Sequence, residues 1–441
     1  MRVRAASRSA AAGAAARSAA LTSDTPPAVG YLDLLRGNAA YRRLWAGQVV
    51  SLLGDWFNLV ATATVVQALT GSGAAVGGLF ALRMLAPFLV SPLAGVVADR
   101  FDRRDVLVTA DLVRAGVVAC FVVVDEPGEV WLLYALTFVQ LGISGFFFPA
   151  HRALLPELVS RRELGAANAL GSATWSTMLA LGAAAGGAVA GWVGTTACFV
   201  IDSGTFLVSA AVLAGIRRPG RDAATAGAAG AGVLHAYLDG LRYLRRSVDV
   251  ALVACHKAAN ALLVAGAFQV VIVAISQERF VVGERGSTGL GLMLALVGVG
   301  TGLGPIAARA VTGDDDRRLR VALAASYAVT GAGVLVVALA GSLPVLLAGA
   351  ALRGVGSGIG WVFSTQLLLH IVPDRVRGRV FSTEFAILTL CSSAGALLAG
   401  WAVDGVGIDG LLLTMAAAIL VPGVLWGVWT RRHPRGLPAE A

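Results

Sequence analysis

Twelve apolar runs of about 20 residues each decide what this chain can fold into. A run of that length crosses the hydrocarbon core of a bilayer as an α-helix, because a helix satisfies its own backbone hydrogen bonds. Six runs lie near residues 44–69, 75–98, 106–124, 130–149, 165–190 and 195–216. Six more lie near residues 248–275, 287–311, 319–340, 344–369, 380–402 and 408–430. The sequence therefore predicts an all-α integral membrane protein with twelve transmembrane helices.

Composition supports the same class and excludes two others. The 441 residues are 57% hydrophobic and 14% charged, and their mean hydropathy of +0.77 is too high for a water-soluble globule. The net charge of +9 does not indicate nucleic acid, because the basic residues stand in small groups between apolar runs. The four cysteines lie inside these runs without metal-ligand spacing. We expect a lipid-embedded protein with no metal, no cofactor and no nucleic-acid partner.

The arginines give the expected orientation, since basic residues concentrate on the cytoplasmic side of a membrane. If both termini are cytoplasmic, 29 arginines fall in cytoplasmic segments and only Arg279 and Arg285 fall in external loops. Moving one span would destroy this alternation. We expect a multi-pass protein of the cell inner membrane with both termini in the cytoplasm.

The polar segments divide the chain into five parts. Residues 1–35 are rich in Ala, Ser and Arg and lack the apolar core of a signal peptide, so we expect a disordered cytosolic tail, with a transit peptide as the alternative. The two groups of six spans occupy residues 36–216 and 246–430. Between them, residues 217–245 form a cytoplasmic linker whose HAYLDGLRYLRR stretch predicts an amphipathic surface helix. Residues 431–441 form a second cytosolic tail.

A charge-dense turn, GVVADRFDRR, separates the second and third spans. It resembles the loop between helices 2 and 3 of the major facilitator superfamily at five positions, Gly95, Asp99, Arg100, Arg103 and Arg104. Gly95 allows a neighbouring helix to approach closely, Asp99 can face the positive N-terminal end of another helix, and the arginines hold the turn in the cytoplasm. The resemblance implies a conformational gate here.

The two groups of spans repeat each other weakly. GPIAAR, at residues 304–309, stands where GVVADR stands in the first group, with Ala308 in place of Asp99. Internal repeats of this kind are typical of transporters built from two related halves. The superfamily resemblance implies two pseudo-symmetric six-helix bundles, in which the second turn is a weaker latch than the first.

A charged side chain at membrane depth must be paired or face a cavity. Seven charged side chains of this chain lie well inside the spans: Asp55, Arg83, Asp111, Arg114, Asp202, Lys257 and Arg353. Asp55 shares a polar face of the first span with Asn58, three residues further on. We predict that this carboxylate lines a cavity and binds a proton or a cationic substrate. The alternative is a structural carboxylate that bonds to a neighbouring helix.

Lys257 is the only lysine in the chain, and Asn260 shares its helix face. Pseudo-symmetry places Lys257 on helix 7 at a depth similar to that of Asp55 on helix 1. A buried lysine can lose its proton whereas arginine cannot. We therefore expect either a titrating group or a fixed counter-ion for Asp55 or another acid.

Shorter polar faces occur on helices 4 and 10, which carry Gln140 and Arg353. Helices 1, 4, 7 and 10 line the central cavity in superfamily members, so the resemblance implies that these faces meet. Arg353 is a candidate to bind an anionic group or to act on Asp55. The alternative is that it pairs with backbone carbonyl groups.

The remaining intramembrane charges are predicted to be structural. Asp111 and Arg114 can pair on one helix. Arg83 can pair with Asp55 or reach toward the outer surface. Asp202 is expected to bond across helices 5 and 6.

Glu384, at the start of helix 11, is the expected partner of Arg100 or Arg104. That contact would close the cytoplasmic side and would break when the cavity opens inward.

The fifth span reads GAAAGGAVAG from Gly182, and Gly186 and Gly187 complete a packing motif. The motif partly resembles the antiporter-associated motif of superfamily exporters, although Ala183 stands where proline is expected. The alternative is that these residues pack closely only because they are small.

Longer stretches, such as YRRLWAGQVVSLLGDW and PDRVRGRVFS, resemble the exporter branch that contains macrolide-efflux and siderophore-efflux proteins. The resemblance implies a monomeric secondary transporter that uses the proton gradient to export a drug-like or secreted amphipathic molecule. The chain has no phosphate-binding loop, no HExxH and no Gly-x-Ser-x-Gly, so we expect neither direct ATP-driven transport nor an enzyme. The alternatives are an importer or uncoupled facilitator of a small metabolite, and a non-transporting membrane receptor or scaffold.

Overall fold

The computed structural model describes residues 30–217 and 241–433, and within these ranges every regular element is helical. The first group of α-helices is α2 (Tyr31–Gly37), α3 (Ala39–Thr70), α4 (Gly73–Arg100), α5 (Arg103–Ala119), α6 (Val130–Leu158), α7 (Leu164–Trp192) and α8 (Thr195–Ala214). The second is α10 (Val248–Asn260), α11 (Gly266–Glu278), α12 (Ser287–Thr312), α13 (Asp316–Ala338), α14 (Leu343–Ile371), α15 (Asp374–Ala418) and α16 (Leu420–Arg432). Short turns are the 3-10 helices η1 (Cys120–Val123), η2 (Pro127–Glu129) and η5 (Glu284–Gly286) and the π-helix η4 (Ala261–Ala265). Most of the predicted tails and linker lies outside the described ranges, although α2 begins inside the range predicted as a tail.

Eleven described segments are long and apolar enough to cross a membrane. The last of them, Val376–Arg432, has 57 residues, whereas one crossing needs about 20. Gly407 interrupts this segment with φ 76° and ψ 173°, so it accounts for two crossings. The prediction of an all-α membrane fold is confirmed, and the segments correspond to the twelve predicted spans.

Short polar residues and glycine set the ends of the spans. Asp102 caps α5 by accepting hydrogen bonds from the backbone N–H groups of Arg104 and Asp105, and Asp315 caps α13 in the same way. Gly71, in the left-handed conformation with φ 60°, ends α3. The charged turns after spans 2 and 8 are therefore also helix-starting turns.

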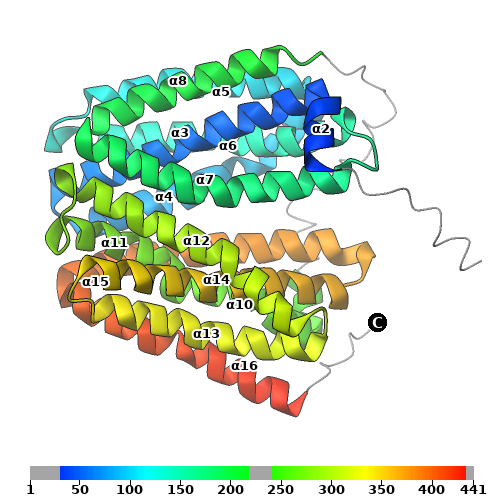
Figure 1. The fold of residues 1–441 in the computed structure, drawn as a ribbon, viewed down its shortest axis with the longest axis vertical. Coiled ribbons are helices and arrows are strands. Elements are labelled where there is room, and N and C mark those ends of the chain that lie inside the picture. Colours follow the sequence, from blue (N-terminus) through cyan, green and yellow to red (C-terminus); the bar gives the residue numbers. More distant parts are fainter. Residues whose placement is uncertain (1–29, 218–240, 434–441) are drawn as a thin grey trace, which may run out of the picture.

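Helices α3–α8 form one bundle and α10–α16 form a second bundle beside it (Figure 1). Between the bundles, α7 packs against α12 and α4 packs against α15. The described chain begins and ends at the same end of the molecule (Figure 1). We call this the terminal end and the other the opposite end.

The hydrophobic core differs between the two ends. At the opposite end, one continuous cluster contains residues of both bundles, among them Phe57 of α3 and Val271 of α11. At the terminal end, Leu34 and Leu154 belong to a cluster of the first bundle, and Phe363 belongs to a separate cluster of the second. The cores of the two bundles are therefore joined at the opposite end and separate at the terminal end.

Glycines allow the bundles to meet at the opposite end. A Cβ added to Gly187 of α7 would lie 2.7 Å from the Cα of Gly291 on α12. A Cβ added to Gly77 of α4 would lie 2.5 Å from the carbonyl oxygen of Ala396 on α15. Since real Cβ atoms do not come so close, these helix pairs touch through their backbones.

Asp404 lies at the opposite end of the molecule, three residues before the bend of α15 at Gly407. Its side chain bonds to the first bundle at the start of α4. Its carboxylate accepts hydrogen bonds from the backbone N–H groups of Gly73 at 2.7 Å and Ala74 at 3.0 Å, and from the Ser72 hydroxyl at 3.0 Å. A carboxylate at a helix N-terminus satisfies free N–H groups and interacts favourably with the helix dipole. One bundle thus caps a helix of the other.

We predict that Gly187→Ala destabilises the purified protein. The added methyl group would push α7 away from α12, at a cost of about 1–3 kcal/mol, and the midpoint of thermal unfolding in detergent should fall.

Gly204→Ala is the matched control, because nothing lies within 4 Å of a Cβ added at Gly204. Its melting temperature should stay the same or rise. Equal melting temperatures for the two variants would show that backbone contact between α7 and α12 is not needed for stability.

Candidate functional site

Charged side chains from four helices gather inside the first bundle. They are Asp55 of α3, Arg83 of α4, Asp111 and Arg114 of α5, and Asp202 of α8, and we call them the N-half charge cluster. Arg114 donates a hydrogen bond to Asp111, and its guanidinium lies 4.2 Å from the ring centroid of Phe206. The charge of Asp55 interacts with those of Arg114 and Arg83. Asn58 is fully buried beside Asp202.

The partners predicted for Asp111, Arg114, Arg83 and Asp202 can be compared with those in the structure. The ion pair of Asp111 and Arg114 on α5 is confirmed. Arg83 interacts with Asp55, which is one of its two predicted roles. The predicted bond of Asp202 across helices 5 and 6 is wrong, because Asp202 faces α3. Gly54 leaves the space, since a Cβ there would lie 3.2 Å from the Cα of Asp202.

The N-half charge cluster has three carboxylates and only two guanidinium groups. With every group ionised, the cluster would carry one net negative charge, which is costly at membrane depth. One bound proton would make the cluster neutral. Asp111 and Asp202 are fully buried, whereas Asp55 is only half-buried. Asp55 is therefore the most accessible carboxylate of the cluster.

Gln140 of α6 lies next to this cluster. Its side chain is 1% exposed, and its backbone carbonyl accepts a hydrogen bond from Ser144 at 3.1 Å. Ser144 in turn accepts one from Arg114 at 3.3 Å. The structure thus brings the polar faces of α3 and α6, the first and fourth predicted spans, to the same buried region.

In the second bundle, Lys257 of α10 pairs with Glu384 of α15. The Nζ–Oε1 distance is 3.0 Å, both side chains are less than 10% exposed, and Nζ lies 4.7 Å from the ring centroid of Trp361. Lys257 is therefore the counter-ion of an acid, as in one of its two predicted roles, but that acid is not Asp55.

The predicted pairing of Glu384 with Arg100 or Arg104 is wrong. We expected helix 11 to begin near residue 380, but α15 begins at Asp374. Glu384 therefore lies about 15 Å along the helix, beyond the level of the loop. Arg104 instead donates hydrogen bonds to Asp105 and to the carbonyl of Ala214.

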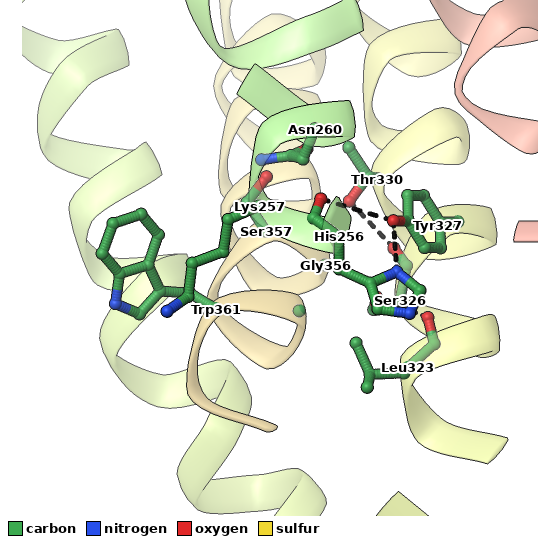
Figure 2. Close-up of a pocket in the computed structure, with 11 residues that line it drawn as sticks. His256, Lys257, Asn260, Leu323, Ser326, Tyr327, Thr330, Gly356, Ser357 and Trp361 are labelled. Carbon is green, nitrogen blue, oxygen red and sulfur yellow. Dashed lines mark hydrogen bonds between the residues drawn. The ribbon is translucent and has the colours of Figure 1, made fainter. Parts of the chain in front are cut away.

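A small polar cavity adjoins this ion pair, between α10, α13 and α14 (Figure 2). Its lining residues are His256, Lys257, Asn260, Leu323, Ser326, Tyr327, Thr330, Gly356, Ser357, Gly360 and Trp361. About 20 Å³ is open to the centre of a water-sized sphere, which is room for one water molecule. The predicted Lys257 and Asn260 therefore share a site with residues that the sequence did not single out.

His256 and Tyr327 are two of these additional residues. The Nδ1 atom of His256 lies 2.5 Å from the Tyr327 hydroxyl, and its Nε2 atom has no hydrogen-bond partner in the described residues. A histidine and a tyrosine inside apolar spans were the available sequence signal. Their pairing joins α10 to α13. Spacing along one helix could not predict a contact between two helices.

Asp249 and Arg320 form a second buried pair that sequence reasoning missed. Their carboxylate and guanidinium groups make two hydrogen bonds, at 2.8 and 2.5 Å. Trp429 donates a further hydrogen bond to Asp249 at 3.2 Å. Both residues stand near the starts of their helices, where charged residues are expected at the membrane surface, so neither was singled out. The pair joins α10 to α13 near the starts of both helices.

Arg353 of α14 is 7% exposed and stands one helical turn before Ser357. Its guanidinium lies 4.8 Å from the ring centroid of Phe268 on α11. Asp55 is not among its contacts, and neither is a backbone carbonyl in the described residues.

Two residues of the predicted gate, Arg103 and Arg104, form hydrogen bonds inside the first bundle. Arg103 donates hydrogen bonds to Glu157 and to the carbonyl of Ala153. Arg100 is exposed at the end of α4. The surroundings of Gly95 and the side chain of Asp99 lie outside the described part of the chain.

The helix-5 glycines all stand at close contacts. A Cβ added to Gly182 would lie 3.0 Å from Trp56 of α3, and one added to Gly186 would lie 3.0 Å from the Cα of Phe57. Together with Gly187, they place α7 against both α3 and α12. No group of His, Cys, Asp or Glu side chains in the described residues is arranged to hold a metal ion.

Comparison with known proteins gives a family and several relatives. The family model of the transmembrane secretion effectors matches residues 34–433. The MFS-type transporter YfiS of Bacillus subtilis is 26% identical over 409 residues, which cover 89% of this chain and 93% of YfiS. Macrolide efflux protein A of Streptococcus pyogenes is 31% identical over 123 residues, which cover 27% of this chain and 30% of that protein.

The fold is also similar to that of solved transporters. The crystal structure of a bacterial homologue of the human lysosomal transporter Spinster, in an inward-facing and unoccupied conformation, matches with a TM-score of 0.67. The two sequences are 14% identical, and the match covers 89% of this chain and 97% of the other. Because the family model spans nearly all of the described residues, the chain belongs to the transmembrane secretion effectors, a family of major facilitator transporters.

Proposed function

We propose that this transporter exports an amphipathic small molecule in exchange for protons. The observation that carries the proposal is the N-half charge cluster, in which three carboxylates face two guanidinium groups and the half-buried Asp55 is the most accessible acid. A proton taken up there changes the charge of the cluster and so changes which conformation is favoured. Export is supported by the relative named as a macrolide efflux protein.

The asymmetric core supports alternating access as the mechanism. The cores of the bundles are joined at the opposite end and separate at the terminal end. A rocking motion of one bundle against the other would break the contacts of α4 with α15 and of α7 with α12 at the opposite end. The bundles would then meet at the terminal end. In the predicted orientation, the end with separate cores faces the cytoplasm.

Proton movement in proteoliposomes tests the role of Asp55. Amphipathic drugs are added one at a time to vesicles that contain a pH-sensitive dye and either the unmodified protein or Asp55→Asn. We expect a transported drug to start proton flux with the unmodified protein. Asp55→Asn should still bind that drug but give no more flux than empty vesicles, because its amide cannot carry a proton.

Asp33→Asn is the control, since Asp33 is exposed on α2. Equal flux through Asp55→Asn and the unmodified protein would make Asp55 structural, and Glu384→Gln would then be the next variant to measure. Drug counterflow that needs no proton gradient would favour the uncoupled facilitator instead.

A second prediction concerns the contact of Asp404 with α4. We expect Asp404→Ala to open the opposite end more often, because it removes three hydrogen bonds between the bundles. In a background without the native cysteines, Val76→Cys reports the opening, since Val76 is 1% exposed. A membrane-impermeant maleimide should label this cysteine about tenfold faster when Asp404 is replaced.

Asp409→Ala is the matched control. Asp409 lies five residues further along the chain, and its ion pair with Arg279 stays inside the second bundle. If both variants are labelled at the same rate, the Asp404 contact does not hold the opposite end closed.

A further inference from the structure

Arg353 differs from the other buried cations of the described chain in having no acidic partner. Arg114 pairs with Asp111, Lys257 with Glu384, and Arg320 with Asp249. Arg353 is 7% exposed, and its contact in the described residues is with the ring of Phe268. Its Nε atom has no hydrogen-bond partner. A buried guanidinium left in this way costs several kcal/mol, so a role beyond stability is expected.

The groups near Arg353 can accept or donate further hydrogen bonds. Ser357 lies one turn along the same face of α14, and its hydroxyl is buried without a partner. Ser357 also lines the small cavity, together with Lys257 and Asn260 (Figure 2). The π-helical turn η4 follows Asn260 directly, and such turns occur frequently at functional sites.

The geometry of the guanidinium limits what can bind it. The ring centroid of Phe268 lies 4.8 Å from the guanidinium carbon, and no described residue accepts a hydrogen bond from the guanidinium, so its N–H groups remain for a ligand. A planar guanidinium with free N–H groups matches a carboxylate, which it can hold through two parallel hydrogen bonds. The two buried ion pairs described in the second bundle, Lys257 with Glu384 and Arg320 with Asp249, are each neutral, so one such anion would also balance the charge of Arg353.

We propose that Arg353 and Ser357 bind an acidic group of the transported molecule, so that the substrate class is amphipathic organic anions that carry a carboxylate. This inference rests on the proposed transport function and adds the chemistry of its substrate. Arg353 holds the carboxylate, and the Ser357 hydroxyl donates a further hydrogen bond to it. A neutral amide of the same size would leave the guanidinium uncompensated.

Two fluorescent probes with the same apolar group test the proposal. Dansylglycine carries a carboxylate, and dansylglycinamide carries a neutral amide in its place. Binding of each probe to the purified full chain is measured from the rise in dansyl fluorescence. We expect the unmodified protein to bind dansylglycine about 10- to 100-fold more tightly than the amide, as expected for charge-assisted hydrogen bonds in a buried site.

Variants at Arg353 connect this preference to the site. In Arg353→Gln the two probes should bind with similar affinity, and in Arg353→Lys the preference should be smaller but present, since lysine keeps the charge and loses the planar pair of donors. Arg279→Gln is the control, because Arg279 pairs with the exposed Asp409, and it should keep the full preference. Melting temperatures show which variants are folded. If Arg353→Gln is unfolded, Arg353→Lys decides.

Equal binding of the two probes by the unmodified protein would overturn the proposal, as would a preference that survives unchanged in the folded Arg353 variants. These measurements need no proton gradient, so they fail separately from the proposed function. A protein without carboxylate preference that still moves protons with another drug would keep proton exchange and lose the anion site. A protein with the preference but without proton flux would keep the anion site and lose proton exchange.

Discussion

Close backbone contact between the two bundles at one end is the interaction on which the rest of the structure depends. Two helix pairs, α4 with α15 and α7 with α12, meet there through glycines such as Gly77 and Gly187. At the terminal end the described core divides into two clusters, one in each bundle. A substituent at these glycines would act on the whole molecule, since in a bilayer association depends on close packing rather than on the hydrophobic effect.

The Asp404 cap at the start of α4 adds polar contacts between the bundles at the same end. From the sequence, Asp99 was expected to face the positive N-terminal end of another helix. At the opposite end the structure has a contact of this type between the bundles, since Asp404 of the second bundle caps α4 of the first. A contact of this kind breaks cleanly when the bundles rock, because water can replace a carboxylate at a solvent-exposed helix end. It suits a closure that must be reversible.

The sequence was sufficient for the fold and only partly sufficient for the site. The length of the apolar runs predicts the spans, because a backbone in lipid must satisfy its hydrogen bonds within the helix. The three-residue spacing along one helix predicted the pair of Asp111 and Arg114. Contacts between helices depend on where each helix begins and on which residues are small. Glu384 was assigned the wrong partner because α15 starts at Asp374. Asp202 was assigned the wrong neighbour because Gly54 opens a space on α3, which no pattern within α8 reveals.

The two bundles differ in their uncompensated charge, and this bears on how the proposed exchange would be driven. The N-half charge cluster has one acid in excess, and Arg353 of the second bundle has no acidic partner among the described residues. A proton and a carboxylate-bearing substrate would therefore each neutralise a different bundle. If one proton enters for each monoanion that leaves, two charges move along the membrane potential. Each is worth about 2.3 kcal/mol per 100 mV, so an inside-negative potential would drive export of an anion even where the pH gradient is small. Exchange of a proton for a monocation would gain nothing from the potential, and the charge of Arg353 would then remain without a function.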